Sequence, residues 1–247
     1  MSFISPDGKH VPSIPAAAMR EVDRVAVEVF GLGILQMMEN AGRNLAGNVL
    51  EMLADGPRDG EVVVLAGGGG NGGGGLCCAR HLHNRHIPVR VVLDRPVERL
   101  SPPARAQWRT ISSAGVSIAG VEQADGTLDN AALIVDALIG YGLTAAPRGN
   151  TARLIEVCSQ APAPVVSLDI PSGRNATNGD APGVAIIPNR TMTLALPKTG
   201  LHECDGELVL ADIGIPPAVF AWIGIEVEAY FGTEYWVPLR RQAPLDG

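Results

Sequence analysis

The sequence predicts an α/β protein: a three-layer α/β/α sandwich with a mostly parallel, Rossmann-like sheet and two N-terminal helices. Short, wholly apolar runs alternate with helical segments, as expected for parallel strands buried on both faces. A glycine-rich stretch joins the first of these runs to the next helix. No low-complexity linker interrupts residues 61–215, which should hold the core sheet and helices. We therefore expect one domain over residues 1–247, a length that a single hydrophobic core can support.

The N-terminal part predicts helices rather than strands. Residues 1–14 form a polar, proline-containing lead-in. Two helical segments are expected at residues 16–30 and 35–53, separated by a Gly-Leu-Gly turn, because apolar residues recur at helical spacing in both. These helices should pack on the sheet.

The rest of the chain predicts alternating strands and helices. The expected strands are 62–66, 89–93, 133–135 and 165–168, a weak strand near Val116, and further β structure at 191–196 and 208–213. The expected helices are 76–85, 103–114 and 151–158. Strands separated by helices in this way build βαβ units.

The overall charge limits the partners. A formal net charge of −7 argues against wrapping of a nucleic acid or binding to an anionic membrane. The N-terminus lacks the cationic and apolar stretches of a secretory signal, and no segment has about 18 uninterrupted apolar residues. We expect a cytoplasmic protein with a small-molecule ligand. A homodimer is a possible assembly.

The glycine-rich segment, AGGGGNGGGG at residues 66–75, is the strongest candidate for ligand binding. Lying between a strand and a helix, it can turn backbone amides toward a phosphate group at the positive end of that helix. The alternative is a flexible surface turn, but so many glycines cost conformational entropy. The segment also contains a loose G-x-G-x-x-G, and Asp94 closes the next strand. This pair defines one alternative, an NAD-dependent oxidoreductase, although Asp94 also fits a solvated strand end.

Two further strand ends carry acids. Asp136 follows the strand 133–135, and Asp169 follows the strand 165–168 just before a turn with Pro171 and Ser172. Because the carboxyl ends of parallel strands face one crevice, both acids should meet the glycine segment there. Taken singly, such an acid is often a helix cap or a solvated group.

Several ordered blocks carry a family resemblance. AGGGGNGGGGLCCARHL resembles the AGxGNNGGDGLVAARHL signature of NAD(P)H-hydrate epimerases, also called YjeF N-terminal domains. MREVDRVAVEVFGLGILQMMENAGRNLA, DALIGYGL, LDIPSG, LALPKTGL and ADIGIPP are similar to the family's other blocks, in the same order. The resemblance covers roughly residues 19–217.

The resemblance implies an isomerase of metabolite repair, which interconverts the R and S epimers of hydrated NADH and NADPH. It implies that Asp169 is the catalytic acid and base, and that a potassium ion is held by Asn71, Asp136 and Ser172. The residues implied to contact the dinucleotide are Gly70, Asn71, Gly72, Gly73, Gly74, Gly140, Tyr141, Gly142, Leu143, Thr144, Ala145, Ala146 and Asp169.

The chain lacks two polar residues of the family pattern. Gly70 and Gly74 stand where the signature has an Asn and an Asp, which removes two polar contacts. This departure motivates a second alternative, a nucleotide-binding interaction module without turnover. Outside the signature, Lys198 can face a phosphate or be a surface lysine, and the histidines at 81, 83 and 86 favour solvated or packing roles over metal binding.

Overall fold

The computed structural model describes residues 2–54 and 59–242, which contain one ten-stranded sheet. The strands are β1 Ser2–Ile4, β2 His10–Pro12, β3 Glu61–Ala66, β4 Val89–Leu93, β5 Ser117–Ala119, β6 Ala131–Ala137, β7 Val165–Leu168, β8 Arg190–Leu194, β9 Glu207–Ala211 and β10 Trp236–Arg241. The α-helices are α1 Ala16–Arg24, α2 Ile34–Ala54, α3 Gly70–His83, α4 Pro102–Ser113, α5 Ala124–Asp129, α6 Gly149–Gln160 and α7 Pro217–Trp222. A π-helical turn spans Val25–Val29, and 3-10 turns span Val97–Arg99, Val121–Gln123 and Thr199–Glu203.

The strand order is β2-β1-β10-β9-β8-β7-β6-β3-β4-β5. The strands from β9 to β5 in this order pair in parallel, whereas β10, β1 and β2 form an antiparallel edge. This arrangement confirms the predicted mostly parallel α/β fold.

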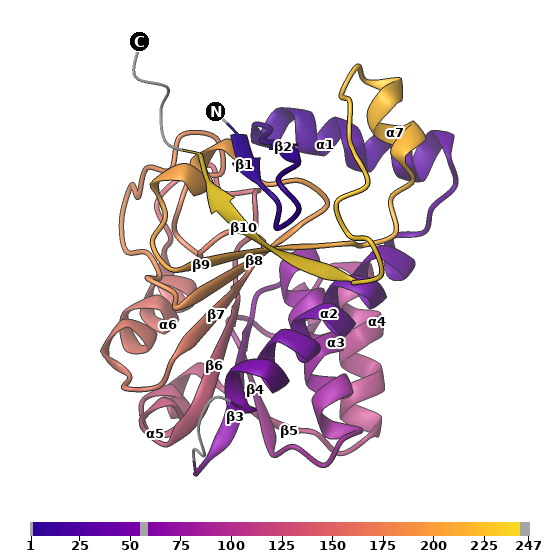
Figure 1. Ribbon diagram of the computed structural model, residues 1–247. Helices are drawn as coiled ribbons and strands as arrows, with labels where there is room; N and C mark the ends of the chain where they lie inside the picture. The colour runs from indigo at the N-terminus through magenta and orange to yellow at the C-terminus, as the bar shows by residue number, and fades with distance from the viewer. Residues whose placement is uncertain (1, 55–58, 243–247) are drawn as a thin grey trace.

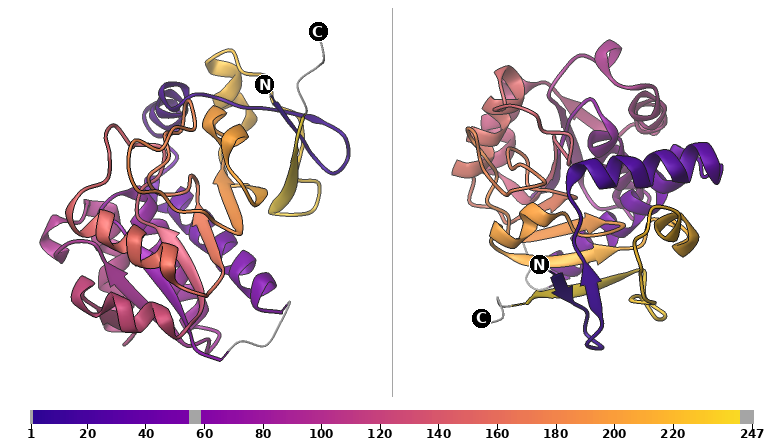
Figure 2. Two further views of the ribbon diagram at one scale, coloured as in Figure 1. Left: turned by 90° about the vertical axis from the view of Figure 1, so that its left-hand side faces the viewer. Right: turned by 90° about the horizontal axis from the view of Figure 1, so that it is seen from above.

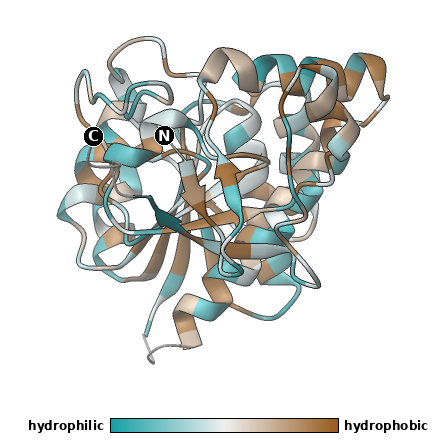
Figure 3. Cartoon of the chain, turned by 45° about the horizontal axis from the view of Figure 1, so that its top comes forward, coloured by the Kyte–Doolittle hydropathy of each residue, from teal (hydrophilic) through white to brown (hydrophobic). Residues whose placement is uncertain are grey.

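Alternation along β3 explains the three layers. Val62 and Val64 pack with α2 and α3 on one face of the sheet, while Val63 and Leu65 pack with α6 on the other. Side chains in a strand point to opposite faces in turn, so an all-apolar strand needs a helical layer on each side. Figure 1 shows α2, α3 and α4 on one side of the sheet and α5 and α6 on the other. The hydropathy colouring of Figure 3 shows brown, hydrophobic residues along the central strands.

Helix α3 begins earlier than the sequence predicts, so the expected start at residue 76 is wrong. Its first residue is Gly70, and the glycines at 72–75 are buried within the helix. A Cβ added at Gly75 would lie 2.6 Å from Cβ of Ala137 on β6. On the neighbouring helix α2, a Cβ at Gly42 would lie 2.4 Å from Cβ of Cys77. Close packing of α3 against β6 and α2 therefore outweighs the low helix propensity of glycine.

The sheet also extends beyond the predicted segment 61–215. Within the expected lead-in 1–14, whose first residue lies outside the described chain, β1 and β2 pair with each other, and β1 pairs with β10 (Figure 2). Phe3 on β1 is fully buried. Sequence periodicity missed β1 and β2 because three residues are too few to show alternation, and the partner β10 lies at the other end of the chain.

No helix of the described residues has both the length and the apolar character needed to cross a membrane.

Candidate active site

A pocket of about 610 Å³ opens at the carboxyl edge of the parallel strands. Asn71 of α3, Gly140 after β6, and Asp169 after β7 line it, so the three strand ends meet as expected from the topology. The N-terminal helices close the pocket from outside the sheet, with Met19 and Asp23 of α1 and Ile34, Met37, Met38 and Ala41 of α2.

Asp169 is held in an unusual conformation. Its φ is 69°, in the left-handed region that side chains other than glycine rarely adopt, at a cost of about 1–3 kcal/mol. Its backbone N–H donates to the Met192 carbonyl at 2.7 Å, and its Oδ1 accepts from the Leu194 N–H at 3.3 Å. Strand β8 therefore fixes both the backbone and the side chain of Asp169.

Lys198 is the unexpected member of the site. Its Nζ forms an ion pair with Asp169 Oδ1 and donates to the Leu194 carbonyl at 2.9 Å. The residue is only 1 % exposed and lines the pocket. The surface-lysine alternative is therefore wrong, because the chain after β8 turns Lys198 inward.

Gly140 lies between two of the predicted site residues. A Cβ added there would lie 3.2 Å from Asn71 Oδ1 and 3.4 Å from Asp169 Oδ2. Glycine at this position leaves Asp169 Oδ2 accessible, while Oδ1 faces Lys198. The carboxyl group thus has one anchored oxygen and one oxygen facing the pocket.

A second carboxyl group, from Asp23 of α1, lines the same pocket. The Tyr141 hydroxyl donates a hydrogen bond to Asp23 Oδ2, and Lys198 Nζ lies 5.9 Å from the centroid of the Tyr141 ring. Burial raises the pKa of Asp23 despite the Tyr141 hydrogen bond and the Lys198 charge, and burial also raises the pKa of Tyr141. Asp23 was not among the site residues predicted from the sequence. Asp23 follows Met19 by four residues and so lies on the same face of the helix, and this spacing could have identified it.

Asp136 differs from its expected position. Strand β6 continues to Ala137, so Asp136 lies within the strand, fully buried. Its carboxylate accepts from the Ser172 Oγ at 2.5 Å, the Ser172 N–H and the Ser167 Oγ at 2.8 Å each, and the Leu138 N–H at 3.3 Å. Burial raises the pKa of Asp136 despite these hydrogen bonds. Asp136 and Ser172 thus contact each other beneath the pocket floor.

The glycine-rich segment divides into two parts. Gly70, Asn71 and Gly74 line the pocket, whereas Gly72 and Gly73 pack inward. A Cβ at Gly72 would lie 1.7 Å from the Gly67 carbonyl oxygen, and the Gly73 N–H already donates to the Gly69 carbonyl. The amides of residues 70–72, in the first turn of α3, are the ones available to an anion.

The segment after β6 also divides. Gly140, Tyr141 and Gly142 line the pocket, but the other implied contacts lie outside its lining: Leu143, Thr144, Ala145 and Ala146.

Asp94 is not a solvated strand end, which was one of its two predicted roles. It is only 3 % exposed, so it is not solvated. Its carboxylate forms an ion pair with Arg95, with Nε at 2.7 Å from Oδ1, and accepts from the Thr151 hydroxyl at 2.7 Å. Both carboxylate oxygens are thus engaged within the protein, in a contact that joins the end of β4 to α6.

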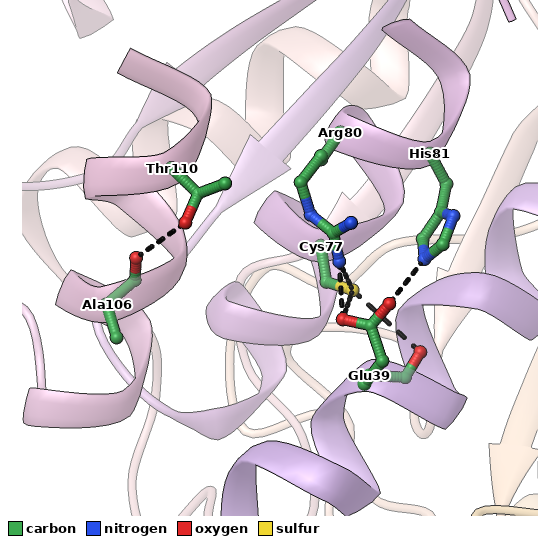
Figure 4. Close-up of polar contacts among 6 residues, drawn as sticks. All are labelled: Glu39, Cys77, Arg80, His81, Ala106 and Thr110. Carbon is green, nitrogen blue, oxygen red and sulfur yellow. Dashed lines mark hydrogen bonds and ion pairs between the residues drawn. The ribbon is translucent and has the colours of Figure 1, made fainter. Parts of the chain in front are cut away.

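A polar cluster between α2 and α3 lies outside this pocket (Figure 4). The Glu39 carboxylate forms ion pairs with Arg80 and with His81, whose Nε2 lies 2.8 Å away, and accepts from the Cys77 thiol at 3.3 Å. The ligand-type atoms of Glu39, Cys77 and His81 lie within 4.8 Å of one another. However, Arg80 Nη2 contacts both the Glu39 carboxylate and the Cys77 sulfur, and burial raises the pKa of Cys77 to about 12. A guanidinium beside a neutral thiol favours an ion-pair network over a metal centre.

The fold and the pocket define a Rossmann-like α/β protein with a buried Asp-Lys pair at the carboxyl edge of its sheet. Residues 34–200 match the family model described as YjeF-related protein N-terminus, and the chain belongs to this family.

Similar proteins carry epimerase names. The chain is 43% identical to an NAD(P)H-hydrate epimerase of Dehalogenimonas lykanthroporepellens over 92% of this chain and 91% of that protein. It is 32% identical to an NAD(P)H-hydrate epimerase of Rhodopirellula baltica over 83% of this chain and 86% of that protein. A bifunctional NAD(P)H-hydrate repair enzyme of Hyperthermus butylicus is 35% identical over 90% of this chain, which spans 42% of that longer protein. The crystal structure of the yeast protein YNL200c has the same fold, with a TM-score of 0.80 at 22% identity over 92% of this chain and all of that one.

Proposed function

We propose that this chain is an isomerase that interconverts the R and S epimers of hydrated NADH and NADPH. The observation that carries this function is the Lys198–Asp169 pair, buried in a pocket beside the N-terminus of α3. The names of two relatives that match over most of their length support the same activity.

The substrate chemistry explains why such a pair is useful. The hydrated carbon is bonded to the ring nitrogen, so it is a hemiaminal carbon. Once its hydroxyl oxygen is protonated, water leaves, the nitrogen lone pair forms an iminium, and water then returns to either face. Each step needs a group that donates or accepts a proton within hydrogen-bonding reach.

The Asp169 carboxyl group performs this transfer through Oδ2, the oxygen beside Gly140. Lys198 holds Oδ1, and Asp169, protonated on Oδ2 from solvent, gives this proton to the departing oxygen. The carboxylate left behind lies next to the cationic iminium and stabilises it. The pair thus combines acid–base chemistry with charge stabilisation.

The first turn of α3 binds the dinucleotide phosphates in this proposal. The amides of residues 70–72 have no partner within the helix and lie at its positive end. Gly70 and Gly74 leave space in the pocket. A Cβ at Gly70 would meet nothing within 4 Å, whereas one at Gly74 would lie 2.7 Å from Leu168 Cδ2, so Leu168 would have to shift to accept a side chain there. The two departures from the family signature therefore widen the pocket without disturbing Asp169.

The buried donor set fits a potassium ion. Asp136 is a buried carboxylate whose four hydrogen-bond donors are all neutral, so a monovalent cation would supply its missing counter-charge. Asn71 would contribute its amide oxygen, Oδ1, which lies beside Gly140. Asn71, Asp136 and Ser172 would hold the ion, and its contribution would be to fix the loops after β6 and β7.

Calorimetry tests the potassium proposal. Titrating potassium chloride into protein kept in choline chloride should give saturable binding, and Asp136→Asn should abolish it. Equal responses to potassium and choline would contradict the ion site without affecting the epimerase proposal.

The epimerase proposal is tested with one purified epimer of hydrated NADH. The parent protein should convert it into a mixture of both epimers, which chromatography resolves. Asp169→Asn nearly keeps the shape of the side chain but cannot cycle a proton, so it should bind the dinucleotide and lose about 100-fold or more of the rate. A parent protein that binds the substrate and never interconverts the epimers would instead favour the interaction module.

A further inference from the structure

Epimerisation makes a demand that one carboxyl group meets poorly. The hydroxyl leaves one face of the nicotinamide ring, and for inversion the water must return on the opposite face. A group beside one face is badly placed to take the proton of water that attacks the other, because proton transfer needs hydrogen-bonding distance. A second acid–base group across the substrate would meet this demand.

Asp23 is the second carboxyl group in the pocket, and it comes from a different layer of the fold. Asp169 follows β7 in the sheet, whereas Asp23 lies on α1, which covers the pocket from outside. Tyr141 is hydrogen-bonded to Asp23, Lys198 is paired with Asp169, and Lys198 Nζ lies 5.9 Å from the centroid of the Tyr141 ring, so a chain of contacts links the two acids. Burial is the main cause of the raised pKa of Asp23, and the Asp169 charge is close enough to add to it.

The Asp23 carboxyl group is oriented for this task. Tyr141 donates to Oδ2, and within residues 2–54 and 59–242 no hydrogen bond reaches Oδ1. Asp169 shows the same division, with Oδ1 anchored by Lys198 and Oδ2 beside Gly140. Each acid therefore has one oxygen fixed by the protein and one oxygen left for the substrate.

We propose that Asp23 is the second acid–base residue of the epimerase and serves the face of the nicotinamide ring opposite Asp169. This inference rests on the proposed function and extends it.

The proton balance is complete. When Asp169 donates its proton, the C–O bond breaks, water departs, and the ring nitrogen forms a C=N bond with its lone pair. A water molecule then adds to the other face, forms the new C–O bond and gives its proton to the Asp23 carboxylate. Asp169 ends ionised and Asp23 protonated, and exchange with solvent, or the reverse conversion, restores the starting state.

Oxygen exchange in ¹⁸O-labelled water separates this role from a structural one. With the parent protein, label should enter the opposite epimer as it forms. In Asp23→Asn, water can still leave and return on the side of Asp169. Inversion should therefore fall about 100-fold. Label should still enter the starting epimer when that epimer carries its hydroxyl on the Asp169 side. Dinucleotide affinity, measured by calorimetry, should stay within a few-fold.

Glu28→Gln is the matched control, because Glu28 is an exposed acid in the turn that continues α1. It should leave both inversion and exchange unchanged. Inversion by Asp23→Asn within a few-fold of the parent rate would overturn the role of Asp23, and so would equal losses of inversion and same-face exchange. A parent protein that never interconverts the epimers would overturn both the proposed function and the role of Asp23. The activity of the parent protein therefore separates failure of the proposed function from failure of the Asp23 proposal alone.

Discussion

Lys198 and Asp169 both form hydrogen bonds with the backbone of one residue, Leu194. The Leu194 N–H donates to the Asp169 carboxylate, and the Leu194 carbonyl accepts from the Lys198 ammonium. The two side chains are 1 % and 5 % exposed, respectively. The end of β8 therefore fixes a buried ion pair from both sides, and removal of either partner leaves an uncompensated charge.

Lys198→Met should destabilise the protein by about 3–5 kcal/mol, because the Asp169 carboxylate is left buried without its counter-charge. The double variant Asp169→Asn, Lys198→Met should lose less than the sum of the two single losses. Urea unfolding of all four proteins measures this coupling. Lys9→Met is the control, since Lys9 is partly exposed and solvent screens its ion pair with Asp7. Additive losses would show that the pair is not coupled.

Gly140→Ala should reduce epimerisation at least about tenfold, with unfolding free energy within about 1 kcal/mol of the parent. Its methyl group would stand between Asn71 and Asp169, 3.2 and 3.4 Å from their side-chain oxygens. Gly142→Ala is the matched control in the same loop, because a Cβ there meets nothing within 4 Å. The steady-state rates of both variants with one purified epimer test this prediction. Equal rates for both variants would exclude a spacing role for Gly140.

Gly72→Ala should cost about 3 kcal/mol or more, or prevent folding, because its methyl group would overlap the Gly67 carbonyl oxygen. Gly70→Ala, two residues earlier in α3, should be neutral or stabilise the protein by up to about 1 kcal/mol, since the site is open. Thermal unfolding of the two variants compares them directly. If Gly72→Ala were as stable as the parent, the backbone around Gly72 could not follow the path described for the start of α3.

Glu39→Gln should alter the pH dependence of stability. Burial raises the pKa of Glu39, but hydrogen bonds from Arg80, His81 and Cys77 outweigh it and lower the pKa from 4.5 to about 2. A lowered folded-state pKa contributes stability above the ordinary value, and this contribution disappears as the pH falls from about 4.5 toward 2. Because the side chain is 42 % exposed, solvent screening limits the effect to about 1 kcal/mol.

Urea unfolding at pH 7 and at pH 3 measures the Glu39 effect. The parent should exceed Glu39→Gln in stability at pH 7 and lose part of that advantage at pH 3. Glu156→Gln, at an exposed position on α6, should show no such difference. A Glu39 advantage that does not change with pH would mean that the carboxylate contributes by packing rather than by charge.

The sequence by itself determined the framework of the fold. All-apolar runs such as 62–66 can be buried only in a sheet covered on both faces, so the runs and the helices between them specified the layers. Parallel strands place their carboxyl ends at one edge, and for that reason Asn71 and Asp169 could be assigned to one crevice before their positions were known. Local pattern and chain direction were enough for these features.

Only the tertiary structure decided what faces the pocket. Lys198 lies 29 residues after Asp169, and nothing local distinguishes it from a surface lysine. Its burial depends on the path of the chain after β8. Asp23 reaches the pocket because α1 packs across the strand ends, and Gly72 is helical because α3 lies close to its neighbours. Each of these depends on contacts between residues distant in sequence, and side-chain periodicity carries no information about such contacts.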